Sequence, residues 1–285
     1  MIHYSYPLYR PPAEADNIII QATYGCSYNN CSFCSMYKDK KYQVRDINDI
    51  FKEIDILASH YPNANKVFLA DGDVLGLNAE YLIQLLKYLK QAFIKLTRVS
   101  TYASAQNILS KTQEELELLY KNNLTLIYFG IESGNDVILK KITKGVTSNQ
   151  IIDALNKASL SGMKISATVI LGIGGVQYSN EHTRDTAKVI NATTINYLST
   201  LQLVIEQGAK ENFYKYFTDF TPLRGSHLIA EQKNFIELLN PINKIIFRSN
   251  HVSNALHLSG VIPKDKGMLL REIELALDRG ELEYE

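Results

Sequence analysis

The chain has 285 residues, 46% of them hydrophobic, and its 30 Lys and Arg residues balance 30 Asp and Glu residues. This length and composition predict a globular protein with a full core, built as one barrel-type domain with or without an appendage. Balanced charge disfavours nucleic acid as a partner, and the chain shows neither a long apolar run nor a secretory signal, which excludes a membrane partner. We therefore expect a cytoplasmic protein.

Short apolar runs alternate with segments of helical periodicity, which predicts repeated β-α units and a parallel sheet. The predicted strands are residues 18–23, 66–70, 98–102, 125–131, 164–171 and 197–205. The predicted helices are residues 47–59, 79–93, 113–122, 148–160 and 181–191. Thr147 and Gln150 have capping-box spacing before the fourth helix. We expect an α/β fold, a partial (β/α)6 barrel of the TIM type over residues 1–205.

All three cysteines, Cys26, Cys31 and Cys34, fall within nine residues directly after the first predicted strand. An odd number in one short run argues against disulfides and against cysteines that only fill a core. Structural zinc would need a fourth ligand, and no histidine lies within twenty residues of the run. An iron-sulfur cluster held by three thiolates leaves one iron open to a small molecule. The run favours such a cluster, with structural zinc as the alternative.

Polar residues follow the next two strands, at the ends where parallel barrels carry their active sites. The second strand runs into Asp71-Gly72-Asp73, where glycine permits close approach of a ligand and carboxylates suit an ammonium group. The same triplet is also a common turn. On the third strand, Ser100 and Tyr102 are candidates to contact a ribose or the substrate, and ordinary strand residues are the equal alternative.

The fourth and fifth strands end in motifs of their own. The fourth ends in Gly-Ile-Glu-Ser-Gly, where Glu132 would be a partly buried carboxylate that needs hydrogen-bond partners, and Ser133 follows it. A simple strand-end turn is the alternative. The fifth ends in a glycine cluster that begins at Gly172 and lacks the Lys-Ser/Thr ending of a P-loop, which argues against a nucleoside triphosphate. His182, in the following helix, is a further candidate.

The pattern loosens after residue 205, and we expect residues 206–285 to form an extension that packs on the core, closes the barrel mouth and faces the substrate. Its expected elements are a helix near 228–239, a strand over 244–247 and a C-terminal helix through about 279. A polar run beyond that strand includes Arg248, Asn250 and His251, candidates to bind a carboxylate-bearing substrate. A polar loop with a structural histidine is the alternative.

The cysteine run resembles the cluster loop of the radical S-adenosylmethionine (radical SAM) superfamily, and the resemblance covers roughly residues 18–205. The usual pattern there is Cys-x3-Cys-x-aromatic-Cys. Phe33 takes the aromatic place, whereas Asn30 stands where the second cysteine is usual, because one extra residue precedes Cys31. Asp71-Gly72-Asp73 is similar to the superfamily's Gly-Gly-Glu-like motif, and the Glu132 segment is similar to its Gly-x-Glu-Ser-Gly element.

The resemblance implies that the three cysteines hold a 4Fe-4S cluster whose open iron is chelated by S-adenosylmethionine (SAM). It places the cofactor near eight residues: Phe33, Asp71, Gly72, Asp73, Ser100, Glu132, Ser133 and Gly172. An electron from an external donor such as flavodoxin or ferredoxin would then cleave SAM to a 5′-deoxyadenosyl radical. That radical would abstract hydrogen from an unidentified substrate, for which we expect a small molecule.

The cysteine count limits the chemistry further. With only three cysteines, we expect neither a second cysteine-ligated cluster nor a methyl-carrying cysteine. Separately, we expect no N-terminal cobalamin domain. Two other functions remain open at this point. An iron-sulfur electron-transfer protein would have a redox-active cluster without SAM turnover, and a zinc-binding interaction module would hold zinc and no iron.

Overall fold

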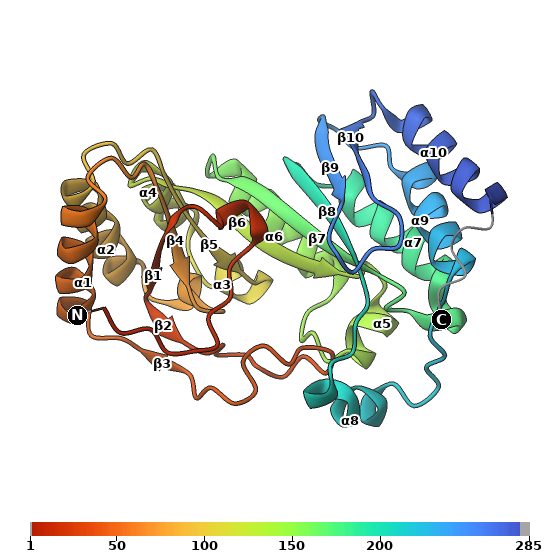
Figure 1. Ribbon diagram of the computed structural model, residues 1–285, viewed down its shortest axis with the longest axis horizontal. Coiled ribbons are helices and arrows are strands. Elements are labelled where there is room, and N and C mark those ends of the chain that lie inside the picture. The colour runs from red at the N-terminus through yellow and green to blue at the C-terminus, as the bar shows by residue number, and fades with distance from the viewer. Residues whose placement is uncertain (1, 280–285) are drawn as a thin grey trace. The chain divides into compact units, whose positions relative to one another are not determined.

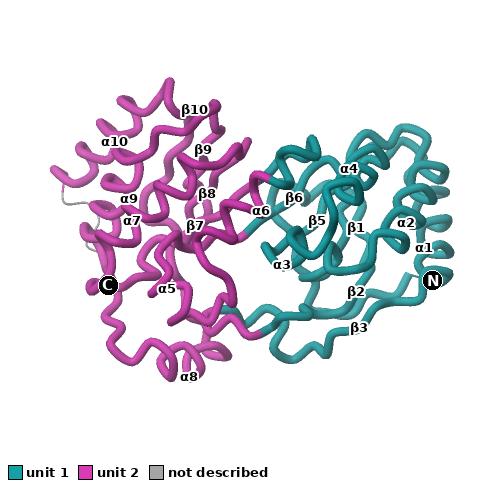
Figure 2. The backbone as a smooth tube through the Cα atoms, turned by 180° about the vertical axis from the view of Figure 1, so that it is seen from behind, with its two compact units in different colours: residues 1–29, 34–129, 157–165 teal, residues 30–33, 130–156, 166–285 magenta. Residues whose placement is uncertain are grey.

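The computed structural model describes residues 2–279 and divides them into two compact units (Figures 1 and 2). Unit 1 contains residues 1–29, 34–129 and 157–165, and unit 2 contains residues 30–33, 130–156 and 166–285. Both units alternate strands with helices, as the sequence predicts. The α/β fold class is therefore confirmed.

The four long strands of unit 1 lie in the order β1-β4-β5-β6, all parallel. Their bounds are β1 Ile18–Gln21, β4 Lys66–Ala70, β5 Arg98–Ala103 and β6 Leu124–Glu132. A small antiparallel pair consists of β2 Thr23–Tyr24 and β3 Gln43–Val44. The helices are α1 Ile47–His60, α2 Ala79–Ala92, α3 Ala105–Leu109 and α4 Gln113–Lys121, with 3-10 turns at Pro12–Glu14 and Val74–Gly76.

The strands of unit 2 lie in the order β7-β8-β9-β10, with β10 antiparallel to β9. Their bounds are β7 Lys164–Leu171, β8 Tyr197–Gln202, β9 Ile245–Ser249 and β10 Leu258–Ile262. The helices are α5 Asp136–Lys141, α6 Ser148–Leu160, α7 Gly175–Asn191, α8 Gln207–Tyr216, α9 Ser226–Leu238 and α10 Lys266–Arg279. Residues 157–165, which include the end of α6 and the start of β7, belong to unit 1. Strand β9 corresponds to the strand predicted over residues 244–247, whereas β10 was not predicted.

Side-chain caps begin most helices of the core, as their sequences favour. The predicted capping box of α6 is confirmed: the Thr147 amide donates to Gln150 Oε1 (2.9 Å), and the Gln150 amide donates to Thr147 Oγ1 (3.3 Å). Thr112 and Glu115 form the same box at α4. Helix α7 begins six residues earlier than predicted and contains a kink at Tyr178.

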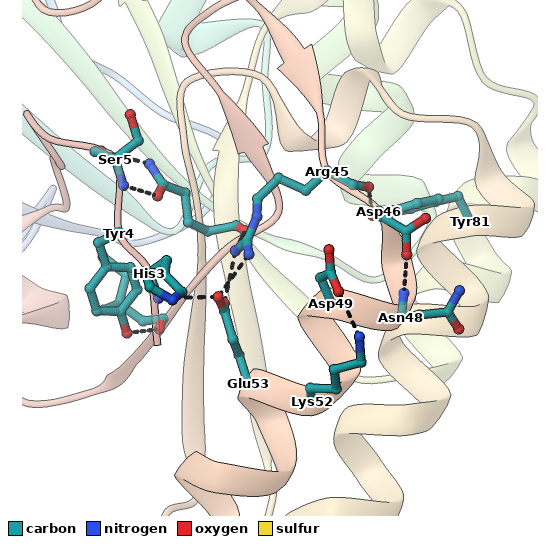
Figure 3. A network of polar contacts seen from close by, with 12 residues as sticks. His3, Tyr4, Ser5, Arg45, Asp46, Asn48, Asp49, Lys52, Glu53 and Tyr81 are labelled. Atoms are coloured by element: carbon teal, nitrogen blue, oxygen red, sulfur yellow. Dashed lines mark hydrogen bonds and ion pairs between the residues drawn. The ribbon is translucent and has the colours of Figure 1, made fainter. Parts of the chain in front are cut away.

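A buried ion pair ties the N-terminal segment of unit 1 to helix α1 (Figure 3). Arg45 and Glu53 form two parallel bonds of 2.8 and 2.7 Å, and the Arg45 guanidinium also donates to the Gln21 carbonyl (2.8 Å). The His3 amide donates to Glu53 Oε1 (3.3 Å), and the Tyr81 hydroxyl donates to the Arg45 carbonyl (2.8 Å). The network therefore fixes the chain on both sides of the cysteine run.

Candidate functional site

The cysteine run follows β1 and β2, and all three cysteines are partly exposed. Cys26 and Cys34 belong to unit 1, whereas Cys31 belongs to the segment 30–33 of unit 2. That segment is anchored within unit 2, because the Ser32 amide donates to the Ile142 carbonyl (2.9 Å) and the Thr143 hydroxyl donates to the Asn30 carbonyl (2.6 Å). Phe33 is partly exposed.

Gly25 makes the turn into the cysteine run possible. Its φ is +69°, and a Cβ at this position would lie 2.9 Å from the Lys40 carbonyl oxygen. Its amide donates to Asp71 Oδ2 (3.0 Å), and its carbonyl accepts from the Gly72 amide (3.2 Å). Only glycine adopts this backbone without strain in so little space. The cysteine run is therefore joined directly to the loop after β4.

Asp71 is fully buried at the carboxyl end of β4, and its two oxygens differ sharply. Oδ2 accepts from Gln21 Nε2 (3.0 Å), from the Gly25 amide (3.0 Å) and from Lys40 Nζ (2.7 Å). Oδ1 is also buried, yet it has no hydrogen-bond partner among the described residues. A buried acceptor left without a donor costs about 1–3 kcal/mol, and a ligand that donates a hydrogen bond would recover that cost.

Gly72 and Asp73, which follow Asp71, pack closely on the cysteine run. A Cβ on Gly72 would lie 2.6 Å from Tyr37 Cε2 and 3.1 Å from Cys26 Cβ. Asp73 is buried and accepts a hydrogen bond from the Ser27 hydroxyl. Burial raises the pKa of Asp73, and hydrogen bonds from Ser27 and Asn107 oppose that shift. The carboxylate of Asp73 therefore has partners within the protein.

Tyr37 is a further candidate that the sequence did not indicate. Its side chain is 5% exposed, and its hydroxyl, like Asp71 Oδ1, is buried without a partner among the described residues. Burial raises the pKa of Tyr37, and nearby Asp71, Tyr102, Cys26 and Cys34 raise it further. The phenol is thus a neutral donor close to two of the three cysteines. Its position three residues after Cys34 was the only available signal.

The two β5 candidates differ in what they contact. Ser100 is fully buried, and its hydroxyl donates to the Val67 carbonyl (3.4 Å) on the neighbouring strand. Tyr102 packs edge-on against Phe68, with ring centroids 5.2 Å apart. Burial raises the pKa of Tyr102, and the Asp71 carboxylate adds to the shift.

In unit 2, Glu132 ends β6 in a left-handed backbone conformation, with φ +62°. Its side chain is nearly buried and forms an ion pair with Lys144 Nζ (2.8 Å). Gly130 leaves space for this carboxylate, because a Cβ there would overlap Glu132 Oε1. The predicted need of Glu132 for a partner is therefore met by Lys144, twelve residues further along the chain.

Ser133 and His182 form a buried pair that belongs to the protein interior. The Ser133 hydroxyl lies 2.9 Å from His182 Nδ1 and accepts from the Asn135 amide (3.1 Å). Burial lowers the pKa of His182 to about 4, so the ring is neutral at pH 7. Both side chains hold the turn after β6 against α7.

Gly172 follows β7 with φ +79°, and its amide donates to Glu231 Oε1 (2.5 Å). Glu231 Oε2 accepts from the Ser179 hydroxyl (2.5 Å), and burial raises the pKa of Glu231 to about 7. An apolar cavity of about 190 Å³ opens beside Gly172. Its lining residues are Gly172, Leu203, Ile205, Phe220, Pro222, Leu223 and Leu228.

The structure separates the three candidates of the polar run. Arg248 is exposed on β9, and Asn250 is exposed just after it. His251 Nδ1 bonds locally to the Ser253 hydroxyl (2.8 Å) and accepts from the Ser253 amide (3.1 Å). Asn254 is buried and bridges the loop to β8, since it donates to the Thr200 carbonyl (2.7 Å). The residues after β9 thus form a turn, whereas Arg248 lies within the strand itself.

The chain resembles several proteins of low sequence identity. It is 24% identical to an uncharacterized methyltransferase of Pyrococcus horikoshii, over 75% of this chain and 42% of that protein. Coproporphyrinogen III oxidase of Escherichia coli, a radical SAM enzyme, superimposes with a TM-score of 0.57 at 14% identity, over 78% of this chain and 50% of the other. The archaeal Elp3 of Methanocaldococcus infernus gives 0.54 at 14% identity, over 93% and 63%.

These structural likenesses support the partial barrel of the TIM type. The chain spans about half or less of the length of the curated relatives it matches. None of the helices described between residues 2 and 279 is long and apolar enough to cross a membrane. The radical SAM superfamily model matches residues 20–189, a segment that includes the cysteine run and the strand-end motifs after β4, β6 and β7. The chain therefore belongs to the radical SAM superfamily, whose members are enzymes that bind a 4Fe-4S cluster and SAM.

Proposed function

We propose that this chain cleaves SAM reductively and abstracts hydrogen from a small-molecule substrate. Cys26, Cys31 and Cys34 would hold the 4Fe-4S cluster, which supplies one-electron reduction of the bound sulfonium when both groups are present. The observation that carries the proposal is the buried Oδ1 of Asp71, which has no hydrogen-bond partner in the described part of the chain and belongs to the loop that packs against Cys26. The family match supports the same reaction.

The chemistry of the unpaired atoms fits an amino-acid ligand. Asp71 Oδ1 is an acceptor, so it would receive a hydrogen bond from an ammonium group such as that of SAM. The Tyr37 hydroxyl is a donor, so it would bind an acceptor such as a carboxylate or a cluster sulfur. Because both atoms are buried, each bond would form with little competition from water.

The other residues that the resemblance assigns to the cofactor would shape its surroundings, either by backbone conformation or by holding a loop or strand in place. In this proposal, Gly72 allows close approach to Cys26, whereas the Asp73 and Ser100 side chains hold their loop and strand through their own bonds. Glu132 and Ser133 fix the turn after β6, and Phe33 flanks the last cysteine. Gly172 would border the cofactor through its backbone, since its left-handed φ turns the chain there.

We propose that residues 206–285 face the substrate. Four of the seven residues that line the apolar cavity come from this part of the chain, and the others follow β7 and β8. A cavity of about 190 Å³ accommodates an apolar group of a few carbon atoms, which suits a small molecule. The electron would come from an external donor such as flavodoxin or ferredoxin.

The proposal is tested on the anaerobically reconstituted chain, reduced with dithionite and mixed with SAM. We expect a SAM-induced change in the cluster's electron paramagnetic resonance spectrum and formation of 5′-deoxyadenosine. A redox-active cluster with neither response would instead indicate an electron-transfer protein. Zinc without iron after anaerobic purification would indicate an interaction module. Either of these outcomes would overturn the proposal.

A further inference from the structure

A row of polar side chains crosses the four strands of unit 2 in register. Thr168 on β7 pairs with Ser199 on β8, Ser199 pairs with Arg248 on β9, and Arg248 pairs with Ser259 on β10. Residues that pair across neighbouring strands point to the same face of the sheet, about 5 Å apart. The sequence separates these residues by up to 91 positions, and the register alone brings them together.

The row lies on the face that the helices of unit 2 leave uncovered. The alternating residues Leu198 and Phe247 are buried, and the Ser249 hydroxyl accepts from Gln232 Nε2 of α9 (2.8 Å), so that helix covers the opposite face. Figure 1 shows α7, α9 and α10 beside these strands. Arg248 and Ser259 are exposed, whereas Thr168 and Ser199 are partly exposed. The row is therefore open to solvent and to ligands.

Arg248 is a cation that has no carboxylate partner on these strands. The sequences of β7, β8, β9 and β10 contain no Asp or Glu. Among the ion pairs between residues 2 and 279, none includes Arg248, whose guanidinium donates only to the Phe247 carbonyl (2.8 Å). Its remaining N–H groups are available, and serine hydroxyls lie on both sides of it.

We propose that this row is an anion-binding site, in which the Arg248 fork and the flanking hydroxyls of Ser199 and Ser259 bind a carboxylate or phosphate. A planar guanidinium binds either group through two parallel bonds, and hydroxyls add neutral hydrogen bonds at the sides. The inference deepens the proposed function, on which it rests, by giving the substrate a negatively charged group. The site itself requires neither the cluster nor SAM.

The experiment measures binding of inorganic pyrophosphate, inorganic phosphate and citrate by calorimetry at low ionic strength. We expect Arg248→Gln to weaken binding of the preferred anion about tenfold or more, because a charged hydrogen-bond donor is lost. Arg248→Lys should give a smaller loss, since it keeps the charge and removes the fork. Ser199→Ala and Ser259→Ala should each weaken binding about threefold to tenfold. A preference for citrate would indicate a carboxylate, and a preference for the phosphates would indicate a phosphate.

Arg271→Gln is the matched control, because Arg271 is an exposed arginine of α10 outside the row. An equal loss in Arg271→Gln and Arg248→Gln would mean nonspecific attraction and would overturn the inference. Absence of binding by the unmodified chain at 10 mM anion, on the order of the weakest specific sites, would also overturn it. Cys31→Ala should bind the anion like the unmodified chain, so failure of the SAM reaction and failure of this site are distinguishable.

Discussion

Two buried carboxyl groups, Asp71 in unit 1 and Glu231 in unit 2, each lie at the carboxyl end of a parallel strand, but their hydrogen-bond partners differ. Asp71 has a cation, Lys40, on one oxygen, and its other oxygen has no partner among the described residues. Glu231 has neutral donors on both oxygens, and burial raises its pKa to about 7. Asp71 therefore still has one oxygen that can accept a hydrogen bond from a ligand. Both oxygens of Glu231 already accept hydrogen bonds from the protein, so its role is structural.

The largest expected effect concerns the three cysteines that we propose as cluster ligands. Cys31→Ala should abolish cluster binding, because two thiolates do not hold a 4Fe-4S cluster, and Asn30→Ala should retain it. Iron and sulfide content per chain after anaerobic reconstitution measures both. Cluster retention in Cys31→Ala together with loss in Asn30→Ala would contradict the ligand assignment.

The second effect concerns the cation that distinguishes Asp71 from Glu231. Lys40→Met should lower the free energy of unfolding by about 3–5 kcal/mol, because it leaves the buried Asp71 carboxylate without its cation. Lys52→Met is the control, since the Lys52–Asp49 pair is exposed and should contribute no measurable stability. Urea denaturation of both variants measures the difference. Equal stability of the two variants would mean that the Lys40–Asp71 ion pair does not stabilise the folded chain.

The third effect is a pH dependence within unit 2. Between pH 4.5 and 6.5 the folded chain keeps Glu231 protonated and His182 neutral, whereas the unfolded chain does the reverse at both sites. Stability from Glu231 is therefore lost as pH rises toward 7, and stability associated with His182 is lost as pH falls from 6.5 toward 4. The two slopes oppose one another.

Glu231→Gln should remove one of these slopes while keeping an acceptor for Gly172. Its stability should then rise with pH from 4.5 to 6.5 by about 2–3 kcal/mol more than that of the unmodified chain. Denaturation at several pH values measures the slope. Parallel pH profiles of the two proteins would show that Glu231 is ionised in the folded state.

The smallest effect concerns the second unpaired atom near Asp71. Tyr37→Phe should change the unfolding free energy of the cluster-free chain by no more than about 1 kcal/mol, because its hydroxyl has no hydrogen bond to any residue between 2 and 279. Tyr128→Phe, which removes a hydrogen bond to buried Glu14 (2.6 Å), should cost about 1–3 kcal/mol.

In the reconstituted chain, Tyr37→Phe should weaken SAM binding about fivefold to tenfold, as expected for one lost hydrogen bond. Equilibrium dialysis against labelled SAM measures this effect. Unchanged SAM affinity would mean that Tyr37 does not contact SAM, and Asp71 would then remain as the proposed contact.

Local sequence patterns predicted the core elements well, since β4, β7 and α6 have the bounds that periodicity indicates. The start of α7 was wrong because glycines disfavour a helix, and tertiary packing overrode that preference. Strand β10 was missed because Ser259 and Gly260 interrupt its apolar run. Helix α8 was missed because its aromatic residues carry no clear helical pattern.

The site was less predictable, because its chemistry depends on contacts between distant positions. The strand-end location of Asp71 followed from the sequence, but its pairing with Lys40, 31 residues earlier, did not. Likewise, Arg248 was grouped with its sequence neighbours Asn250 and His251, whereas strand register places it between Ser199 and Ser259. Such groupings follow from register and packing, which no single segment encodes.

The contact at Gly72 also constrains how this protein can evolve. Because a Cβ at position 72 would press on both Tyr37 and Cys26, alanine there is tolerated only after residue 37 becomes smaller. Positions 37 and 72 should therefore be epistatic: Gly72→Ala alone should be deleterious, and the same change in a background with a small residue at 37 should be mild. Along any viable series of substitutions, a smaller residue at position 37 must therefore precede alanine at position 72.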